Sequence, residues 1–165
     1  MMRKIIISFA LIFSLHYAAN AQDTKTAKLY NPKENAEEAL AKVVEQAKAE
    51  GKNVFVQIGG NWCVWCLRFN DFAERDTQIN AVIKANYIIY HLNFSTENEN
   101  KKLLERFSYP QRFGFPVFLI LNDKGERMHT QDSGLLEMGK SYSKEKVMAF
   151  LFNWTNKAMN PKLYK

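Results

Sequence analysis

The stretch Val54–Cys66, which reads VFVQIGGNWCVWC, decides the fold. Its first five residues, 54–58, form a mostly apolar, β-branched run that is typical of a buried strand. Gly59 and Gly60 then end that strand. The segment Trp62–Arg75 has the pattern of a helix, so both cysteines fall at its start. The sequence therefore predicts a strand, a glycine turn and a helix that opens on a cysteine pair.

The two cysteines of the chain, Cys63 and Cys66, are three residues apart. A disulfide that closes so short a loop constrains the unfolded chain little, so stability alone does not explain the pair. A helix N-terminus has unpaired N–H groups and a partial positive charge, which favour a thiolate at Cys63. Cys66 lies one turn further on the same face, at a separation that suits a disulfide. We therefore predict that Cys63 is a nucleophile and that Cys66 is the resolving thiol of a thiol–disulfide exchange.

Helices and strands alternate along the rest of the chain. Strands joined through a helix are expected to be parallel, and strands joined by a tight turn antiparallel. This order predicts an α/β fold in three layers, with a mixed central sheet covered by helices on both faces. The expected elements are helices starting at Pro32 and stopping at Gly51, over 62–75, around 79–83, around 103–107 and over 147–158 with Ser143 as its cap, and strands over 54–58, 87–94, 117–121 and 126–130.

The N-terminus has the three parts of a secretory signal peptide. Arg3 and Lys4 form a basic start, residues 5–15 are an apolar run, and Ala19-Asn20-Ala21 is a cleavage site of small residues. A membrane anchor is the alternative, but the apolar run is shorter than the roughly 20 residues that span a bilayer. We therefore predict a signal peptide over 1–21 and an exported protein, periplasmic or secreted, with no stable membrane insertion after cleavage.

Cleavage would leave a polar leader over 22–31 and a single well-buried domain over 32–160. The formal net charge would fall from +6 to +4, because Arg3 and Lys4 leave with the signal. The remaining basic residues are scattered among acidic ones, so a solvated surface is favoured over a nucleic-acid patch. No dimerisation segment is evident, and we expect a monomer.

Several motifs together resemble the thioredoxin superfamily. They are the stretch Val54–Cys66, the pair Leu92-Asn93 and the tripeptide Gly114-Phe115-Pro116. By element order the likeness extends over about residues 33–158. Within the superfamily the chain is similar to exported single-domain thioredoxin-like thiol:disulfide interchange proteins, which implies a thioredoxin-like fold.

The resemblance implies three further site residues. Pro116 would form a cis peptide bond beside the cysteines, Phe115 would offer its backbone groups to a docked peptide, and Trp62 would line the site. The residues alone leave a trans edge proline open for Pro116, and core packing open for Trp62. For Trp65 the two roles, site and core, are equally favoured.

Three positions depart from thioredoxin itself. The dipeptide between the cysteines is Val64-Trp65 instead of Gly-Pro. Gln57 stands where thioredoxin has a buried acid, and an amide cannot ionise. His91 stands where thioredoxin has a lysine, and a histidine can titrate near neutral pH. Structural roles are favoured for Gln57 and His91, with modulation of the cysteines as the alternative.

These observations predict a protein thiol–disulfide oxidoreductase of the cell envelope, without an organic cofactor or metal. Its partners would be protein thiols and disulfides, together with an upstream redox protein. One alternative is a non-catalytic binding module with a thioredoxin-like surface. Another is metal handling by the thiolates, although zinc normally takes four nitrogen or sulfur ligands, or three plus water, and only His91 and His129 remain to help once the signal is cleaved. The direction of electron flow stays open among reductase, oxidase and isomerase.

Overall fold

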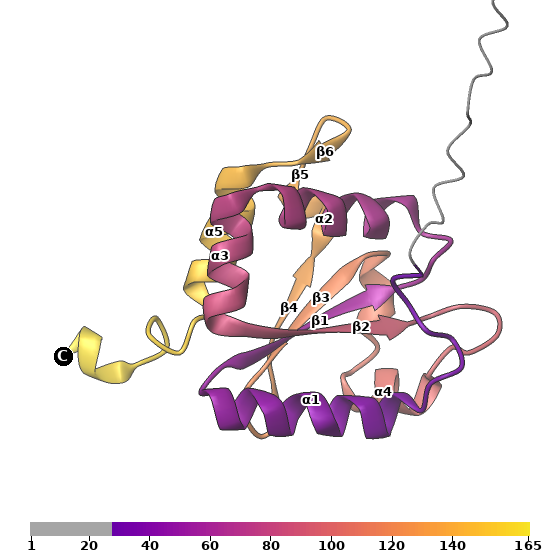
Figure 1. Cartoon of the computed structure of the whole chain (residues 1–165), viewed down its shortest axis with the longest axis horizontal. Coiled ribbons are helices and arrows are strands. Elements are labelled where there is room, and N and C mark those ends of the chain that lie inside the picture. Colours follow the sequence, from indigo (N-terminus) through magenta and orange to yellow (C-terminus); the bar gives the residue numbers. More distant parts are fainter. Residues whose placement is uncertain (1–27) are drawn as a thin grey trace, which may run out of the picture.

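A four-stranded mixed sheet forms the centre of the molecule (Figure 1). The computed structural model describes residues 28–165. The first two strands are parallel, whereas β3 is antiparallel to both β1 and β4. These pairings confirm the predicted mixed sheet and its C-terminal hairpin. In the sheet order β2-β1-β3-β4, the strands are β2 (Tyr87–Asn93), β1 (Asn53–Gly59), β3 (Val117–Leu121) and β4 (Arg127–Asp132).

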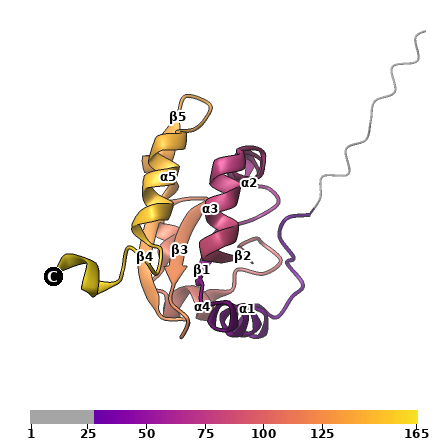
Figure 2. The ribbon, with the colours of Figure 1, turned by 60° about the vertical axis from the view of Figure 1, so that its left-hand side comes forward.

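Helices cover both faces of this sheet, which confirms the three-layer α/β fold (Figures 1 and 2). α1 and α4 supply apolar residues to the cluster on one face, and α2, α3 and α5 supply those on the other. The predicted signal peptide, 1–21, lies outside the described residues. Within residues 28–165 no helix is long and apolar enough to cross a membrane. The helices are α1 (Ala36–Glu50), α2 (Val64–Arg75), α3 (Thr77–Asn86), α4 (Lys101–Arg106) and α5 (Lys144–Asn153).

The central strand β1 is buried along its whole length. Alternate side chains of a strand point to opposite faces. Val54, Val56 and Ile58 accordingly pack with α1, whereas Phe55 packs with α2, α3 and α5. Because both faces are covered by helices, the strand is a nearly continuous apolar run. Gln57 is the polar exception.

Helix ends correct two predicted boundaries. The first helix begins at Ala36 and not at Pro32, because the side chain of Asn35 accepts the N–H of Glu38 (3.4 Å) and caps it. The last helix has its predicted cap, since Ser143 accepts the N–H of Lys146. That helix ends at Asn153, short of the predicted residue 158.

A small hairpin between β4 and α5 has no counterpart in the sequence prediction. It comprises β5 (Glu137–Met138) and β6 (Ser141–Tyr142), and it follows a 3₁₀ turn over Ser133–Leu136. Strands of two residues are too short to produce a periodic pattern. The hairpin matters because the hydroxyl of the buried Tyr142 donates to the carbonyl of Trp65 (3.0 Å), beside the cysteines.

Leu29 and Tyr30 belong to the folded domain, which corrects the predicted polar leader over 22–31. Tyr30 is 0% exposed, and Leu29 packs beside it. The Asn61 side chain holds this segment from both sides: it accepts the N–H of Tyr30 (3.1 Å) and donates to its carbonyl (2.8 Å). The folded domain therefore begins before residue 32.

Candidate active site

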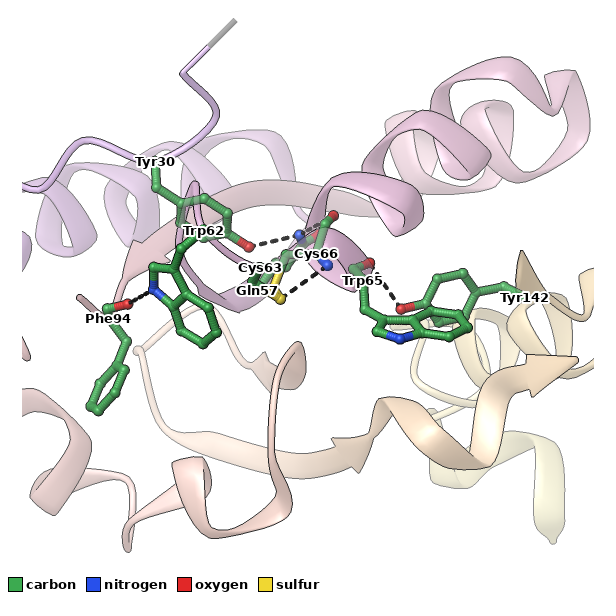
Figure 3. The surroundings of a disulfide bond; sticks show 8 residues. All are labelled: Tyr30, Gln57, Trp62, Cys63, Trp65, Cys66, Phe94 and Tyr142. Atoms are coloured by element: carbon green, nitrogen blue, oxygen red, sulfur yellow. Dashed lines mark hydrogen bonds between the residues drawn. A yellow bond between two sulfur atoms is a disulfide. The ribbon is translucent and has the colours of Figure 1, made fainter. Parts of the chain in front are cut away.

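A disulfide joins Cys63 and Cys66 at the start of α2 (Figure 3). Cys63 is the N-cap of the helix, with extended backbone angles, and its Sγ accepts the N–H of Cys66 (3.1 Å). The two Cα atoms are 5.2 Å apart, which confirms that the predicted spacing suits a disulfide. The helix begins at Val64 and not at Trp62, because the extended Cys63 terminates it on that side.

The two sulfur-bearing residues differ slightly in depth. Cys63 is 5% exposed and Cys66 is 0% exposed. Both belong to a cluster with Tyr30, against which Phe115 and Trp65 also pack. The outer position of Cys63 and the inner position of Cys66 agree with the roles of attacking and resolving thiol, which stay predictions.

The two glycines before the pair permit close packing that a side chain would prevent. A Cβ on Gly59 would lie 2.3 Å from Cys66 Sγ. A Cβ on Gly60 would lie 2.3 Å from Trp62 Nε1 and 2.8 Å from the carbonyl oxygen of Phe94. The sequence pattern indicates only that these glycines end a strand. They are also required by the positions of the disulfide and of Trp62.

Pro116 lies directly before β3, and the Phe115–Pro116 peptide bond is cis, as predicted. Pro116 is buried, whereas Phe115 is partly exposed and packs against the cysteine cluster. The Phe115 ring stacks on Phe94 with centroids 4.8 Å apart, and it meets Trp62 edge-on at 5.4 Å. Phe115 therefore lies between the disulfide and an aromatic rim that consists of Trp62 and Phe94.

Trp62 forms the exposed part of that rim. Its side chain is 56% exposed, yet its Nε1–H donates to the carbonyl of Phe94 (2.8 Å), which fixes the ring (Figure 3). A fixed, exposed indole next to a buried disulfide fits the predicted lining role better than core packing. The hollow beside it is also lined by Glu97 and Glu99.

Trp65 packs on the opposite side of the pair from Trp62 (Figure 3). Its ring meets Tyr142 edge-on at 5.7 Å between centroids, and the Arg68 guanidinium lies 4.9 Å from its centroid. Trp65 is partly buried and contacts both the cysteine cluster and the core under α2. These contacts favour the packing role.

Gln57 is hydrogen-bonded to the backbone of Cys66, the inner cysteine. Its buried Nε2 donates to the Tyr30 hydroxyl (2.7 Å) and to the carbonyl of Cys66 (3.0 Å). His91 is its register partner on β2, and the His91 ring meets Tyr30 edge-on at 5.5 Å. Burial lowers the pKa of His91 to about 4. The partly buried imidazole is therefore neutral near pH 7, which favours the structural role of His91 over modulation of the cysteines by its titration.

Tyr30 is a site residue that the sequence patterns do not indicate. It lies only two residues before Pro32, in a segment whose polar composition gave no sign of burial, and no periodic pattern marks a single inserted residue. Elsewhere in the described chain, His129 stacks on Trp154 with centroids 4.4 Å apart. No three His, Cys, Asp or Glu side chains of residues 28–165 gather closely enough to hold a metal ion.

The fold and the site together indicate the class of protein to which the chain belongs. A mixed sheet between helices, a Cys-x-x-Cys disulfide at a helix start and a cis-proline beside it support a thiol–disulfide oxidoreductase. A family model described as thioredoxin-like matches residues 35–123, and the chain belongs to this family.

Solved structures agree with this fold. A disulfide isomerase from Xylella fastidiosa Temecula1 has a TM-score of 0.68 and 20% identity, over 78% of this chain and 97% of that chain. A thioredoxin from Thermus thermophilus has a TM-score of 0.53 and 18% identity, over 76% of this chain and 92% of that chain. The search of curated proteins found no match.

Proposed function

We propose that the protein exchanges disulfides with other proteins in the cell envelope through the Cys63–Cys66 pair. The observation that supports this most directly is the disulfide at the start of α2, with Cys63 as helix cap. A structural bridge of this length stabilises little, whereas a sulfur at a helix N-terminus is well placed to react as a thiolate.

The exchange proceeds in two sulfur displacements. In the reducing direction the Cys63 thiolate attacks a substrate disulfide, forms a mixed disulfide and releases one substrate thiolate. The Cys66 thiolate then attacks Cys63 Sγ, which releases the second substrate thiolate and leaves the Cys63–Cys66 disulfide. Two electrons pass to the substrate. The reverse sequence oxidises a substrate dithiol.

Substrates would dock on the edge formed by Phe115 and the aromatic rim. The backbone of Phe115, next to the cis-Pro116 and the cysteine cluster, would hydrogen-bond an extended chain. Trp62 would cover an apolar side chain of that peptide. This docking mode suits unfolded or loosely folded protein segments with a thiol or disulfide.

The cell envelope is proposed from the sequence of residues 1–21, which has the features of a cleaved signal peptide. Disulfides persist in such oxidising compartments, where an upstream redox protein would return the pair to its working state. Mass spectrometry of the protein purified from periplasm, medium and cytosol tests this. A mature N-terminus at Gln22 supports export, and an intact Met1 in the cytosol excludes it.

Exchange itself is tested with the purified mature chain and an unfolded, disulfide-bonded protein substrate. The wild type, reduced beforehand, should reduce the substrate with one disulfide formed at Cys63–Cys66 per substrate disulfide broken. The double variant Cys63→Ala/Cys66→Ala should be inert. Tight substrate binding without exchange by the wild type would instead indicate a binding module. Equilibration with glutathione buffers then gives the reduction potential, and with it the direction of electron flow.

A further inference from the structure

Tyr30 is a buried phenol that packs in one buried cluster with the two cysteines of the redox pair, Cys63 and Cys66 (Figure 3). The ideal Cβ position of Gly59 lies 3.0 Å from the Tyr30 hydroxyl oxygen and 2.3 Å from Cys66 Sγ. The Tyr30 hydroxyl and the Cys66 sulfur therefore both lie close to Gly59, the last residue of β1. Tyr30 precedes the residues that match the family, 35–123.

The hydrogen bonds of the Tyr30 hydroxyl leave its own proton available. Gln57 Nε2 donates to the hydroxyl oxygen (2.7 Å), which occupies the acceptor side of that group. Among residues 28–165 the structure, with the disulfide closed, gives this hydroxyl no nitrogen, oxygen or sulfur acceptor for its hydrogen. A buried O–H without an acceptor is costly, and the neighbouring sulfur is the group that can accept once it is charged.

The chain holds Tyr30 in this position by its backbone. The Asn61 side chain makes hydrogen bonds to both the N–H and the carbonyl of Tyr30. Asn98 Nδ2 donates to the carbonyl of Pro32 (3.2 Å), two residues further on. The segment is thus fastened to the loop before Cys63 and to the loop after β2. These hydrogen bonds fix the backbone of Tyr30 beside the redox pair.

The titratable groups packed around the pair are neutral at pH 7. Burial raises the pKa values of Tyr30 and Tyr142 well above their usual range, and burial lowers the pKa of His91 to about 4. The charged group on this part of α2 is Arg68, which lies over the outer ring of Trp65. A thiolate at Cys66 would thus depend on hydrogen bonds more than on a neighbouring charge.

We propose that the Tyr30 hydroxyl donates a hydrogen bond to the Cys66 thiolate whenever the Cys63–Cys66 disulfide is open. This inference rests on the proposed exchange function and names the residue that stabilises its inner sulfur. When a substrate thiolate attacks Cys63 Sγ, the S–S bond breaks and Cys66 Sγ leaves with the electron pair as a thiolate. In the reverse step the same thiolate attacks Cys63 Sγ. Tyr30 keeps its proton throughout and shares it with the sulfur.

The test measures the pKa of Cys66 in a Cys63→Ala background, where the thiol cannot form the disulfide. Tyr30→Phe keeps the ring and removes only the hydroxyl. Loss of a hydrogen bond to the charged sulfur should raise the pKa of Cys66 by about one unit or more. The ultraviolet absorbance of the thiolate, recorded as a function of pH, measures this pKa. Tyr87→Phe is the matched control, because its buried hydroxyl donates to the carbonyl of Leu151, in the cluster on the α2, α3 and α5 face. Equal Cys66 pKa values in the two variants would overturn the proposal.

A second measurement keeps Tyr30 and therefore does not depend on whether the Tyr30→Phe variant folds. In the Cys63→Ala chain with isotope-labelled tyrosine, the Tyr30 ring carbon that bears the hydroxyl should shift in NMR spectra with the same midpoint as the Cys66 thiolate. Tyr87 should not shift. A Tyr30 chemical shift that does not change when Cys66 ionises would exclude the hydrogen bond.

Turnover separates this proposal from the proposed function. In the chain with both cysteines, Tyr30→Phe should slow resolution of a mixed disulfide about threefold, because a tenfold loss of thiolate is partly offset by greater intrinsic nucleophilicity. A wild type without exchange activity would overturn the proposed function, whatever the Cys66 pKa. An active wild type with unchanged resolution and unchanged Cys66 pKa in Tyr30→Phe would overturn the role of Tyr30 alone.

Discussion

The two sides of the Cys63–Cys66 disulfide differ in exposure, chemistry and origin. The outer side consists of Trp62, Phe94 and Phe115, three aromatic residues that are exposed or partly exposed. The inner side consists of Tyr30, Gln57 and His91, polar groups from the N-terminal segment, β1 and β2, of which the first two are buried and His91 is partly buried. The outer side can meet a substrate, and the inner side can only act on the sulfurs.

This difference separates binding from reactivity. An exposed aromatic rim supplies contact area for a peptide but has no group that changes a sulfur's charge. A buried phenol or amide contributes nothing to docking, yet in a low-dielectric interior its hydrogen bonds act strongly on a neighbouring thiolate. Variants on the outer side should therefore change kcat/KM through docking, and variants on the inner side should change the properties of the cysteines themselves.

The largest expected effect distinguishes the two sulfurs. Cys63→Ala should abolish exchange, because no outer nucleophile remains. Cys66→Ala should still attack, but it should accumulate a mixed disulfide with the substrate, since no inner thiol releases it. Non-reducing gels of either variant incubated with a disulfide-bonded substrate measure this. If Cys63→Ala traps substrate as well as Cys66→Ala does, the outer and inner roles are reversed.

The two glycines offer a matched pair of changes, one for each side. Gly59→Ala would place a Cβ 2.3 Å from Cys66 Sγ, and Gly60→Ala would place one 2.3 Å from Trp62 Nε1. Each should lower the free energy of unfolding by about 3 kcal/mol, the upper end for overpacking. Urea unfolding of the oxidised protein measures the loss.

The two glycine variants also differ in their expected effects on reduction potential and substrate docking. Gly59→Ala should change the reduction potential, whereas Gly60→Ala should leave it unchanged and weaken docking. The exposed Gly134, whose Cβ would meet only the Asp132 side chain, is a suitable control for alanine substitution. Identical changes in potential in the two variants would show that the sides are not separable.

The sequence predicted the outer side better than the inner side. Its members lie within or next to recognisable motifs: Trp62 precedes Cys63, and Phe115 precedes the cis-Pro116. The sheet and its pairings followed from apolar runs and connection types, so they too were predictable. The motifs and apolar runs that indicate these features are each contained in a short stretch of sequence, so they could be recognised without knowledge of the tertiary contacts.

The inner side depends on tertiary contacts between segments far apart in the chain. Tyr30 reaches Gln57 across 27 residues, and no spacing rule links them. His91 was placed opposite Gln57 by strand register, but its pKa depends on burial that only packing determines. The β5–β6 hairpin was missed for a related reason, since Tyr142 is buried by contacts with α2 and not by its own strand pattern.

His91 gives the inner side a pH dependence of stability. Its pKa is about 4 in the folded chain and near 6.5 when unfolded. Between these values the unfolded chain binds more protons, so the free energy of unfolding should fall as pH falls from about 6.5 to about 4 and be fully present above that window. The His91 contribution is at most about 3 kcal/mol.

The variant His91→Gln, which cannot be protonated, isolates this contribution. Urea unfolding of wild type and variant at pH 7 and near pH 4.5 gives the loss on acidification for each chain. The variant's loss should be smaller, even if its stability at pH 7 is lower through altered packing. Equal losses would mean that His91 is solvated in the folded state and that the inner side is not closed to water.

The smallest expected effect tests the outer side alone. Trp62→Ala should lower kcat/KM for an unfolded substrate by the equivalent of about 1–3 kcal/mol, because a fixed, exposed indole is lost from the docking edge. Trp62→Phe keeps an aromatic ring but lacks the N–H that donates to the carbonyl of Phe94, so it separates ring contact from ring orientation. The Cys63–Cys66 reduction potential should be the same in both variants, since the rim contains no group that hydrogen-bonds either sulfur. A shift in potential without a loss of kcat/KM would assign Trp62 to the chemistry of the sulfurs and would join the two sides into one functional unit.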